Sequence, residues 1–128
     1  MRVWKVILLV LAMACLATAP VKAQWFTGQN VIPLGYCQLK TQLASAAAFL
    51  TACAGQIPTG ATCVLLGVET VTINMRDDGT APTASTGMPL PPTITPFPYC
   101  GNLAALQFIA SSSTPALDVL FYRLTGGQ

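Results

Sequence analysis

The sequence predicts an all-β fold, a small β-sandwich or jelly-roll-like domain stapled by disulfides, with room for one short helix. Three observations predict it: a stretch of alternating polar and apolar residues, a segment with six prolines, and four cysteines behind a hydrophobic N-terminus. Alternation with a period of two is typical of a strand with one buried face. Prolines and paired cysteines are typical of loop-rich exported β domains.

Residues 1–23 have the organisation of a secretory signal peptide. Arg2 and Lys5 precede eleven consecutive apolar residues at 6–16, and small residues follow up to Ala23. Charge, apolar core and small-residue cleavage site occur in that order in signal peptides. The apolar run is too short to cross roughly 30 Å of hydrocarbon. We therefore expect cleavage before Gln24, no stable membrane span, and a single β-rich domain over 24–128.

The predicted mature chain carries few charges. Three basic and four acidic residues remain after cleavage, a net charge of −1. So few basic residues cannot form a nucleic-acid footprint. The chain has no histidine, which excludes Ser-His-Asp triads, Cys-His dyads and imidazole metal ligands. Fourteen Thr and five Ser supply most of the polar surface, and so little charge leaves self-association weakly opposed.

Four cysteines remain in the predicted mature chain: Cys37, Cys53, Cys63 and Cys100. An even number in an exported protein predicts two disulfides, and three pairings are open. A Cys₄ metal site is disfavoured because no C-x₂-C pair is present. Cys15 leaves with the signal peptide unless it is acylated as in a lipoprotein. We expect a periplasmic or extracellular location, with no metal and no cofactor.

The first element predicted in the mature chain is a candidate helix at 43–50. Its apolar residues Leu43, Ala46, Ala47 and Leu50 are spaced as on one helix face, and Thr41 is placed to cap it. The alternative is a turn-like stretch between strands.

Residues 63–75 predict one long strand, with Gly67 as the site of a bulge. Asp78-Gly79 then predicts a type I′ turn, which needs positive φ at both central residues, and a chain reversal after Asp77. The proline-rich segment 81–99 predicts an extended loop or sheet edge, because proline cannot donate to a sheet ladder.

Two further strands are expected at 103–109 and 117–124. The second places Leu117, Val119 and Phe121 on one face, and its other face is also largely apolar. That pattern suits a sandwich interior or a subunit contact.

The charge cluster Arg76-Asp77-Asp78, followed by Gly79, is the first candidate site. Two carboxylates on a turn are a candidate ion site for Ca²⁺. Glycoside hydrolysis needs two carboxylates that flank one bond, and neighbours on a hairpin point to opposite faces. The alternative is a structural turn in which Asp78 forms the turn, Asp77 caps it and Arg76 pairs across the strands. We predict no catalytic residues.

Aromatic residues are the second candidate site. Trp25, Phe97 and Tyr99 lie in terminal and loop-like surroundings and could stack on a carbohydrate. Core packing is the alternative for these three, and we expect it for Phe108 and Phe121.

The chain resembles small β-rich proteins of tailed phages and prophages of proteobacteria, uncharacterised and regarded as virion-associated. The resemblance rests on IPTGA at 57–61, RDDGTAPTASTGMPL at 76–90, and the segments 103–109 and 117–122, and it spans residues 57–123. It implies a compact β-sandwich or jelly-roll module without enzymatic activity that assembles on a particle or surface. A signal peptide and four cysteines distinguish this chain from a virion protein and favour an exported relative.

Taken together, these observations predict an exported, non-enzymatic structural or interaction module, with phage origin as one option. It would act by assembly or surface binding, with itself or with a protein or glycan surface as partner, and not with nucleic acid. The first alternative is a secreted carbohydrate-binding module using the aromatics above. The second is an exported hydrolase built on Asp77 and Asp78.

Overall fold

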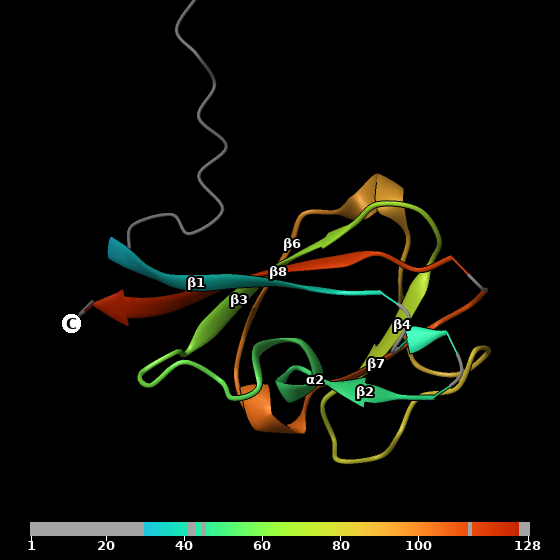
Figure 1. The fold of residues 1–128 in the computed structure, drawn as a ribbon, viewed down its shortest axis with the longest axis horizontal. Helices are drawn as coiled ribbons and strands as arrows, with labels where there is room; N and C mark the ends of the chain where they lie inside the picture. Colours follow the sequence, from blue (N-terminus) through green and yellow to red (C-terminus); the bar gives the residue numbers. More distant parts are fainter. Residues whose placement is uncertain (1–29, 41–42, 45, 113, 126–128) are drawn as a thin grey trace, which may run out of the picture.

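The structure is a computed structural model that describes residues 30–40, 43–44, 46–112 and 114–125. These residues form two antiparallel four-stranded sheets (Figure 1). Sheet A has the strand order β1-β8-β3-β6, and sheet B the order β2-β7-β4-β5. The strands are β1 (Asn30–Leu39), β2 (Ala48–Phe49), β3 (Cys63–Val68), β4 (Ile73–Arg76), β5 (Met88–Leu90), β6 (Phe97–Cys100), β7 (Gln107–Ala110) and β8 (Leu117–Thr125). The helical turns are α2 (Thr51–Ala54), η2 (Pro92–Ile94) and η3 (Leu103–Ala105).

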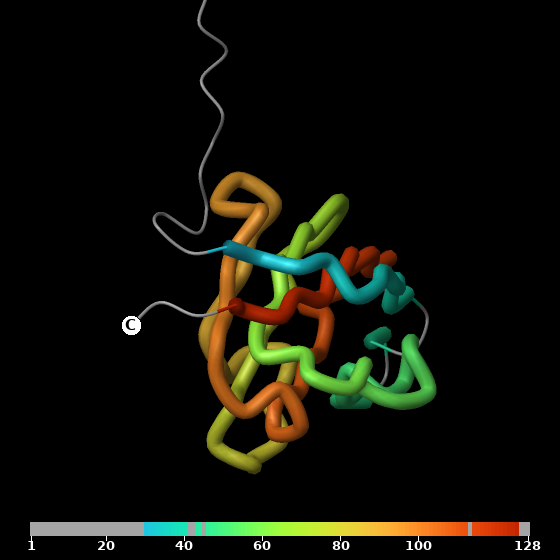
Figure 2. The backbone as a smooth tube through the Cα atoms, turned by 90° about the vertical axis from the view of Figure 1, so that its left-hand side faces the viewer, coloured from blue at the N-terminus to red at the C-terminus, as the bar shows by residue number. Residues whose placement is uncertain are grey.

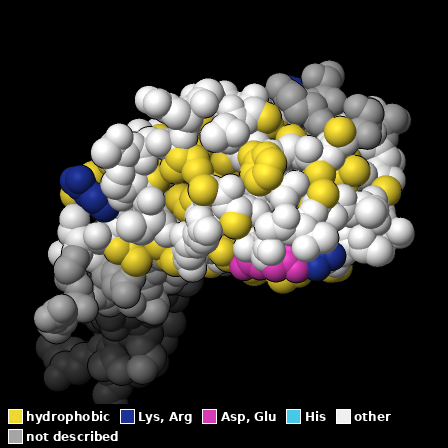
Figure 3. All heavy atoms as spheres, turned by 90° about the horizontal axis from the view of Figure 1, so that it is seen from below, with side chains coloured by type: hydrophobic (Ala, Val, Ile, Leu, Met, Phe, Trp, Pro, Cys, Tyr) yellow, Lys and Arg dark blue, Asp and Glu magenta, His cyan; other side chains and the backbone are white. Residues whose placement is uncertain are grey.

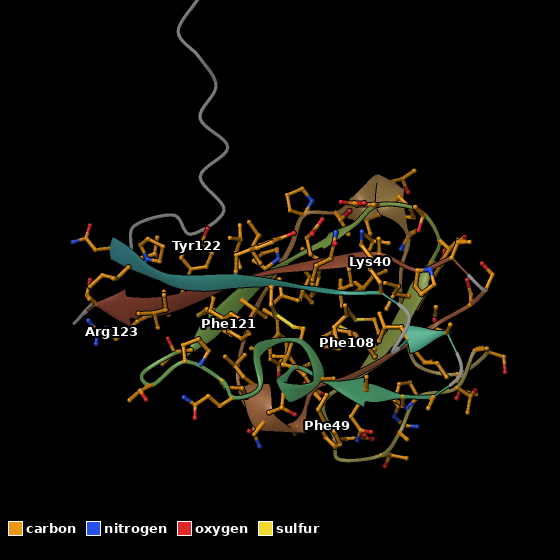
Figure 4. The ribbon with its side chains drawn as sticks, in the orientation of Figure 1. Lys40, Phe49, Phe108, Phe121, Tyr122 and Arg123 are labelled. Atoms are coloured by element: carbon orange, nitrogen blue, oxygen red, sulfur yellow. A yellow bond between two sulfur atoms is a disulfide. The ribbon has the colours of Figure 1, made fainter. Side chains whose placement is uncertain are left out.

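The hydrophobic core lies between the two sheets. Alternate residues of β3 and β8 face it from sheet A, and residues of β4 and β7 face it from sheet B. Phe108 and Phe121 are its largest fully buried side chains, and both point into the space between the sheets (Figure 4). Tyr122, the next residue along β8, points to the opposite side. The prediction of a small disulfide-bonded all-β domain is confirmed.

The predicted long strand at 63–75 is wrong, because it is two strands in different sheets. β3 ends at Val68 in sheet A, residues 69–72 cross over, and β4 begins at Ile73 in sheet B. Gly67 does not interrupt β3, since it pairs with Asp118 of β8. The alternation continues through the crossing because both strands bury one face against the same core.

The predicted reversal after β4 occurs, but not as a two-residue turn. β4 pairs antiparallel with β5, and residues 77–87 connect them. Gly79 has a φ of 80°, whereas among the described residues no residue other than glycine has a positive φ. Asp78 therefore cannot occupy a type I′ position. The connection lies on the side of sheet B remote from sheet A (Figures 1 and 2).

The proline-rich segment 81–99 runs along sheet edges. β5 is an edge strand of sheet B, β6 is an edge strand of sheet A, and the turn η2 lies between them. The predicted edge is confirmed, although the segment is less loop-like than expected. Edge positions tolerate proline because a missing N–H there breaks no ladder bond.

The predicted helix at 43–50 is wrong within the residues described. Ala48 and Phe49 form strand β2, and the short helix α2 follows it; Thr41 lies outside the described residues. Leu43 and Leu50 are nevertheless fully buried, so core packing produces the spacing that resembles a helix face. The strand predicted at 103–109 is shorter than expected because it begins as η3, whereas β8 confirms the strand predicted at 117–124.

Both disulfides are present, and the structure selects one of the three pairings. Cys37–Cys53 links β1 to α2 with a Cα–Cα distance of 5.7 Å. Cys63–Cys100 joins directly opposed residues of β3 and β6 with a Cα–Cα distance of 4.1 Å. Disulfides persist in oxidising compartments, so they indicate an exported protein. The predicted signal peptide, residues 1–23, lies outside the described residues.

None of the helices in the described ranges has the length and hydrophobicity needed to cross a membrane.

Candidate functional site

The predicted turn motif is held by local hydrogen bonds. Arg76 Nε donates to Asp78 Oδ1 at 3.2 Å, Arg76 Nη2 forms an ion pair with Asp78 Oδ2, and the Thr80 amide donates to Asp78 Oδ1 at 3.0 Å. The Arg76 hydrogen bond lowers the pKa of Asp78 below its ordinary value. Arg76 thus pairs with a residue two positions on, and the prediction that it pairs across the strands is wrong. Gly79 lies beside this pair.

Asp77 connects the same loop to the other sheet. The Tyr99 hydroxyl on β6 donates to Asp77 Oδ2 at 3.0 Å. A Cβ on Gly101 would lie 2.5 Å from that hydroxyl, so a side chain at this position would displace the Tyr99 ring. Burial, followed by the hydrogen bond to Asp77, raises the pKa of Tyr99. The two predicted carboxylates therefore have separate partners, Tyr99 and Arg76.

Asn74 holds the loop over sheet B. Its side chain is 7% exposed on the outer face of β4, and its Nδ2 donates to the carbonyls of Thr83 and Ala84 at 3.0 and 2.9 Å. Gly87 closes the loop, with a φ of 130° and the Met75 carbonyl oxygen 3.1 Å from where a Cβ would lie. The motif at 76–90 thus stabilises the loop that connects β4 to β5.

The three predicted stacking aromatics do not form one exposed platform in the described structure. Phe97 and Tyr99 lie opposite Leu66 and Val64 of β3, half-buried and packed against the core. Trp25 lies outside the described residues.

An exposed aromatic ring instead lies on the outer face of sheet A. We define the Tyr36 cluster as the side chains that gather around it: Tyr36, Gln38, Glu69, Asp118 and Leu120. Tyr36 and Gln38 of β1 lie directly opposite Leu120 and Asp118 of β8, and Glu69 follows the end of β3. Tyr36 is 60% exposed and Leu120 37% exposed.

Hydrogen bonds fix the polar side of this cluster. The Tyr36 hydroxyl donates to Asp118 Oδ1 at 2.5 Å, and Gln38 Nε2 donates to the same oxygen at 2.9 Å. Gln38 Nε2 also lies 3.4 Å from Glu69 Oε1. Two carboxylates, one amide and one phenol therefore form a connected network beside an exposed ring.

One carboxylate of the Tyr36 cluster, Asp118, perturbs the other, Glu69. A hydrogen bond to Asp118, and the charge of Asp118, raise the pKa of Glu69 above its ordinary value, and Lys40 opposes this. The hydrogen bond to Asp118 also raises the pKa of Tyr36. The negative charge of Asp118 thus makes the ionised form of Glu69 less favourable than in a free side chain.

A pocket lies between β1 and α2. Its volume is about 430 Å³, and it lies beside the Cys37–Cys53 disulfide. Tyr36 belongs both to the pocket lining and to the cluster. The other lining residues are Gly35, Cys37, Cys53, Ala54, Gln56, Pro58 and Phe121.

The opposite side of the molecule also exposes apolar side chains. Figure 3 looks onto the side of α2 and β2, where hydrophobic side chains gather in the middle and charged ones lie at the margins. Phe49 is 43% exposed, and Figure 4 shows it pointing away from the sheets.

Sequence reasoning missed the Tyr36 cluster as a site. Its local signal was present, since Tyr36 and Gln38 are two apart and Asp118 and Leu120 are two apart, which puts each pair on one strand face. Nothing local indicated that β1 pairs with β8.

In the described part of the chain, no group of three or more His, Cys, Asp or Glu side chains could hold a metal ion. Comparison with protein-family models, curated proteins and solved structures found no match.

Proposed function

We propose that the protein is an exported, non-enzymatic interaction module that binds a surface outside the cytoplasm through the outer face of sheet A. The Tyr36 cluster is the observation that supports this most directly. It combines an exposed ring and an exposed Leu120 with a polar network on one strand-paired surface. Periplasmic and extracellular locations both fit the two disulfides.

The placement of acidic residues supports a binding role for this face. The chain has four acidic residues, and two of them, Glu69 and Asp118, are both hydrogen-bonded to the Gln38 amide. Like charges that are close together destabilise a folded protein, so stability alone would favour placing these two carboxylates apart. Local arrangements that oppose stability concentrate at functional sites.

The same geometry disfavours hydrolysis by this pair. Glycosidase carboxyl groups lie at least about 5 Å apart so that they flank the bond being cleaved. Glu69 and Asp118 are instead both hydrogen-bonded to the single amide nitrogen of Gln38. Asp77 and Asp78 are occupied by Tyr99 and Arg76.

Co-sedimentation of the purified, oxidised protein with cell envelopes, and separately with phage-like particles, from the source cells tests the proposal. We expect binding to one of these surfaces, and we expect Tyr36→Ala to reduce it several-fold. Phe49→Ala is the matched control, because Phe49 is an exposed aromatic on the other sheet. Binding that Phe49→Ala removes and Tyr36→Ala leaves intact would overturn the proposal.

A further inference from the structure

We infer that the Tyr36 cluster is a saccharide-binding site, with the Tyr36 ring as the stacking surface and Gln38, Glu69 and Asp118 as the hydroxyl-binding groups. This inference rests on the proposed function and adds the chemical class of the ligand. It assigns carbohydrate binding to residues other than Trp25, Phe97 and Tyr99.

The apolar half of the site is the Tyr36 ring together with Leu120. A sugar ring has one face of C–H groups, which packs against an aromatic face that is left open to solvent. Tyr36 is 60% exposed although its hydroxyl is hydrogen-bonded to Asp118, so the ring is both oriented and accessible. Leu120 lies directly opposite on β8 and extends the apolar surface.

The polar half supplies donors and acceptors next to that ring. Gln38 carries an amide with both functions, and Asp118 and Glu69 carry carboxyl oxygens. The hydrogen bonds of Gln38 to Asp118 and towards Glu69 hold these groups in place before a ligand arrives. Groups that are already ordered lose less conformational entropy on binding.

The chemistry favours a hydroxyl-rich ligand over a cation. A cation needs acceptors only, whereas a hydroxyl both donates and accepts. The cluster offers both functions, because the Gln38 amide donates and the carboxyl oxygens of Asp118 and Glu69 accept.

Backbone amide NMR of the oxidised protein tests this inference. The probes are four tetrasaccharides, made of β-1,4-linked N-acetylglucosamine, β-1,4-linked glucose, α-linked mannose and β-linked galactose, each titrated to roughly 20 mM. We expect at least one of them to shift resonances of β1 and β8. Tyr36→Ala should weaken that binding by about five- to tenfold, the range expected for loss of ring stacking.

Two variants separate stacking from other effects. Tyr36→Phe keeps the ring and should retain most of the affinity, and Phe49→Ala should leave it unchanged. Shifts that are insensitive to Tyr36→Ala, or no shifts with any tetrasaccharide, would overturn the inference. If a lysine-rich peptide shifted β1 and β8 and no sugar did, the site would be a cation site and the inference would be wrong. Envelope or particle binding that still depends on Tyr36 in those cases would leave the proposed function standing.

Discussion

At the residue scale, the neighbouring carboxylates Glu69 and Asp118 destabilise the fold when both are ionised. Asp118, through a hydrogen bond and its negative charge, raises the pKa of Glu69 above the value of 4.5 for a free side chain. A group whose pKa is raised by folding stabilises the protein at pH values below its unfolded pKa. That stabilisation is lost as the pH rises through the raised pKa, so the pair is unfavourable at neutral pH.

Glu69→Gln is therefore expected to stabilise the protein at pH 7, raising the melting temperature by roughly 1–4 °C, as for other exposed charge pairs. The gain should vanish near pH 3.5, where Glu69 is protonated in both states. Circular dichroism melts between pH 3.5 and 7.5 measure this. Asp78→Asn is the opposite-sign control, because the pKa of Asp78 is lowered and its contribution is lost only as the pH falls. A Glu69→Gln variant that is less stable at pH 7 would contradict this reading of the pair.

Asn74 stabilises the fold through a buried amide. Asn74→Ala removes both hydrogen bonds to the loop carbonyls of Thr83 and Ala84. Losing these two hydrogen bonds should cost about 1–3 kcal/mol, which urea unfolding would measure. Asn102 is exposed, so Asn102→Ala should change the free energy of unfolding by less than about 0.5 kcal/mol. Equal effects of the two variants would show that Asn74 does not anchor the loop.

At the scale of elements, the loop at 77–87 links the two sheets. It is held to β4 by Asn74 and to β6 by the hydrogen bond from Tyr99 to Asp77. A loop fixed at both ends explains why its sequence includes a glycine with positive φ at each of two positions, Gly79 and Gly87.

Gly87→Ala is expected to destabilise the protein more than Gly55→Ala. Both positions have positive φ, which costs about 1–2 kcal/mol for a residue with a Cβ. At Gly55 nothing lies within 4 Å of the added Cβ, whereas at Gly87 the Met75 carbonyl oxygen is 3.1 Å away. Chemical denaturation of both variants measures the difference. If Gly55→Ala were the more damaging, the close packing at Gly87 would be excluded as the cause.

Elements of this fold that depend on local sequence patterns could be predicted from the sequence. Elements that depend on which strands pair with one another could not. β8 and the edge position of the proline-rich segment were predicted, because alternation and missing N–H groups are local properties. The division of residues 63–75 into β3 and β4 was not predicted, because both strands bury alternate apolar residues in the same core. The helix predicted at 43–50 is wrong because Leu43 and Leu50 are buried at a helical spacing while Ala48 and Phe49 pair with β7.

At the scale of the whole molecule, the two disulfides close loops with sequence separations of 16 and 37 residues. Both disulfides involve sheet A. One links β1 of this sheet to α2, and the other links its strands β3 and β6. The presence of two bridges could be predicted from the cysteine count, but their pairing required the strand order. The candidate site could not be predicted from the sequence for the same reason. Tyr36 and Asp118 are 82 residues apart and meet only when β1 pairs with β8.

Removing either bridge should destabilise the protein by about 2–5 kcal/mol. In the chain-entropy model the Cys37–Cys53 bridge contributes about 3 kcal/mol and the Cys63–Cys100 bridge about 4 kcal/mol, because the second closes the longer loop. Denaturation of the two paired Cys→Ser variants measures both values. Unchanged melting in both variants would contradict a disulfide-stabilised fold.

Binding through the outer face of sheet A is tested most directly by side-chain oxidation footprinting. Hydroxyl-radical labelling of the oxidised protein, free and bound to envelopes or particles, would be followed at individual side chains by mass spectrometry. We predict that labelling of Tyr36 and Leu120 falls several-fold on binding, while labelling of Phe49 and Met88, which are also exposed, does not change. Protection of Phe49 and Met88 with Tyr36 still fully labelled would contradict it.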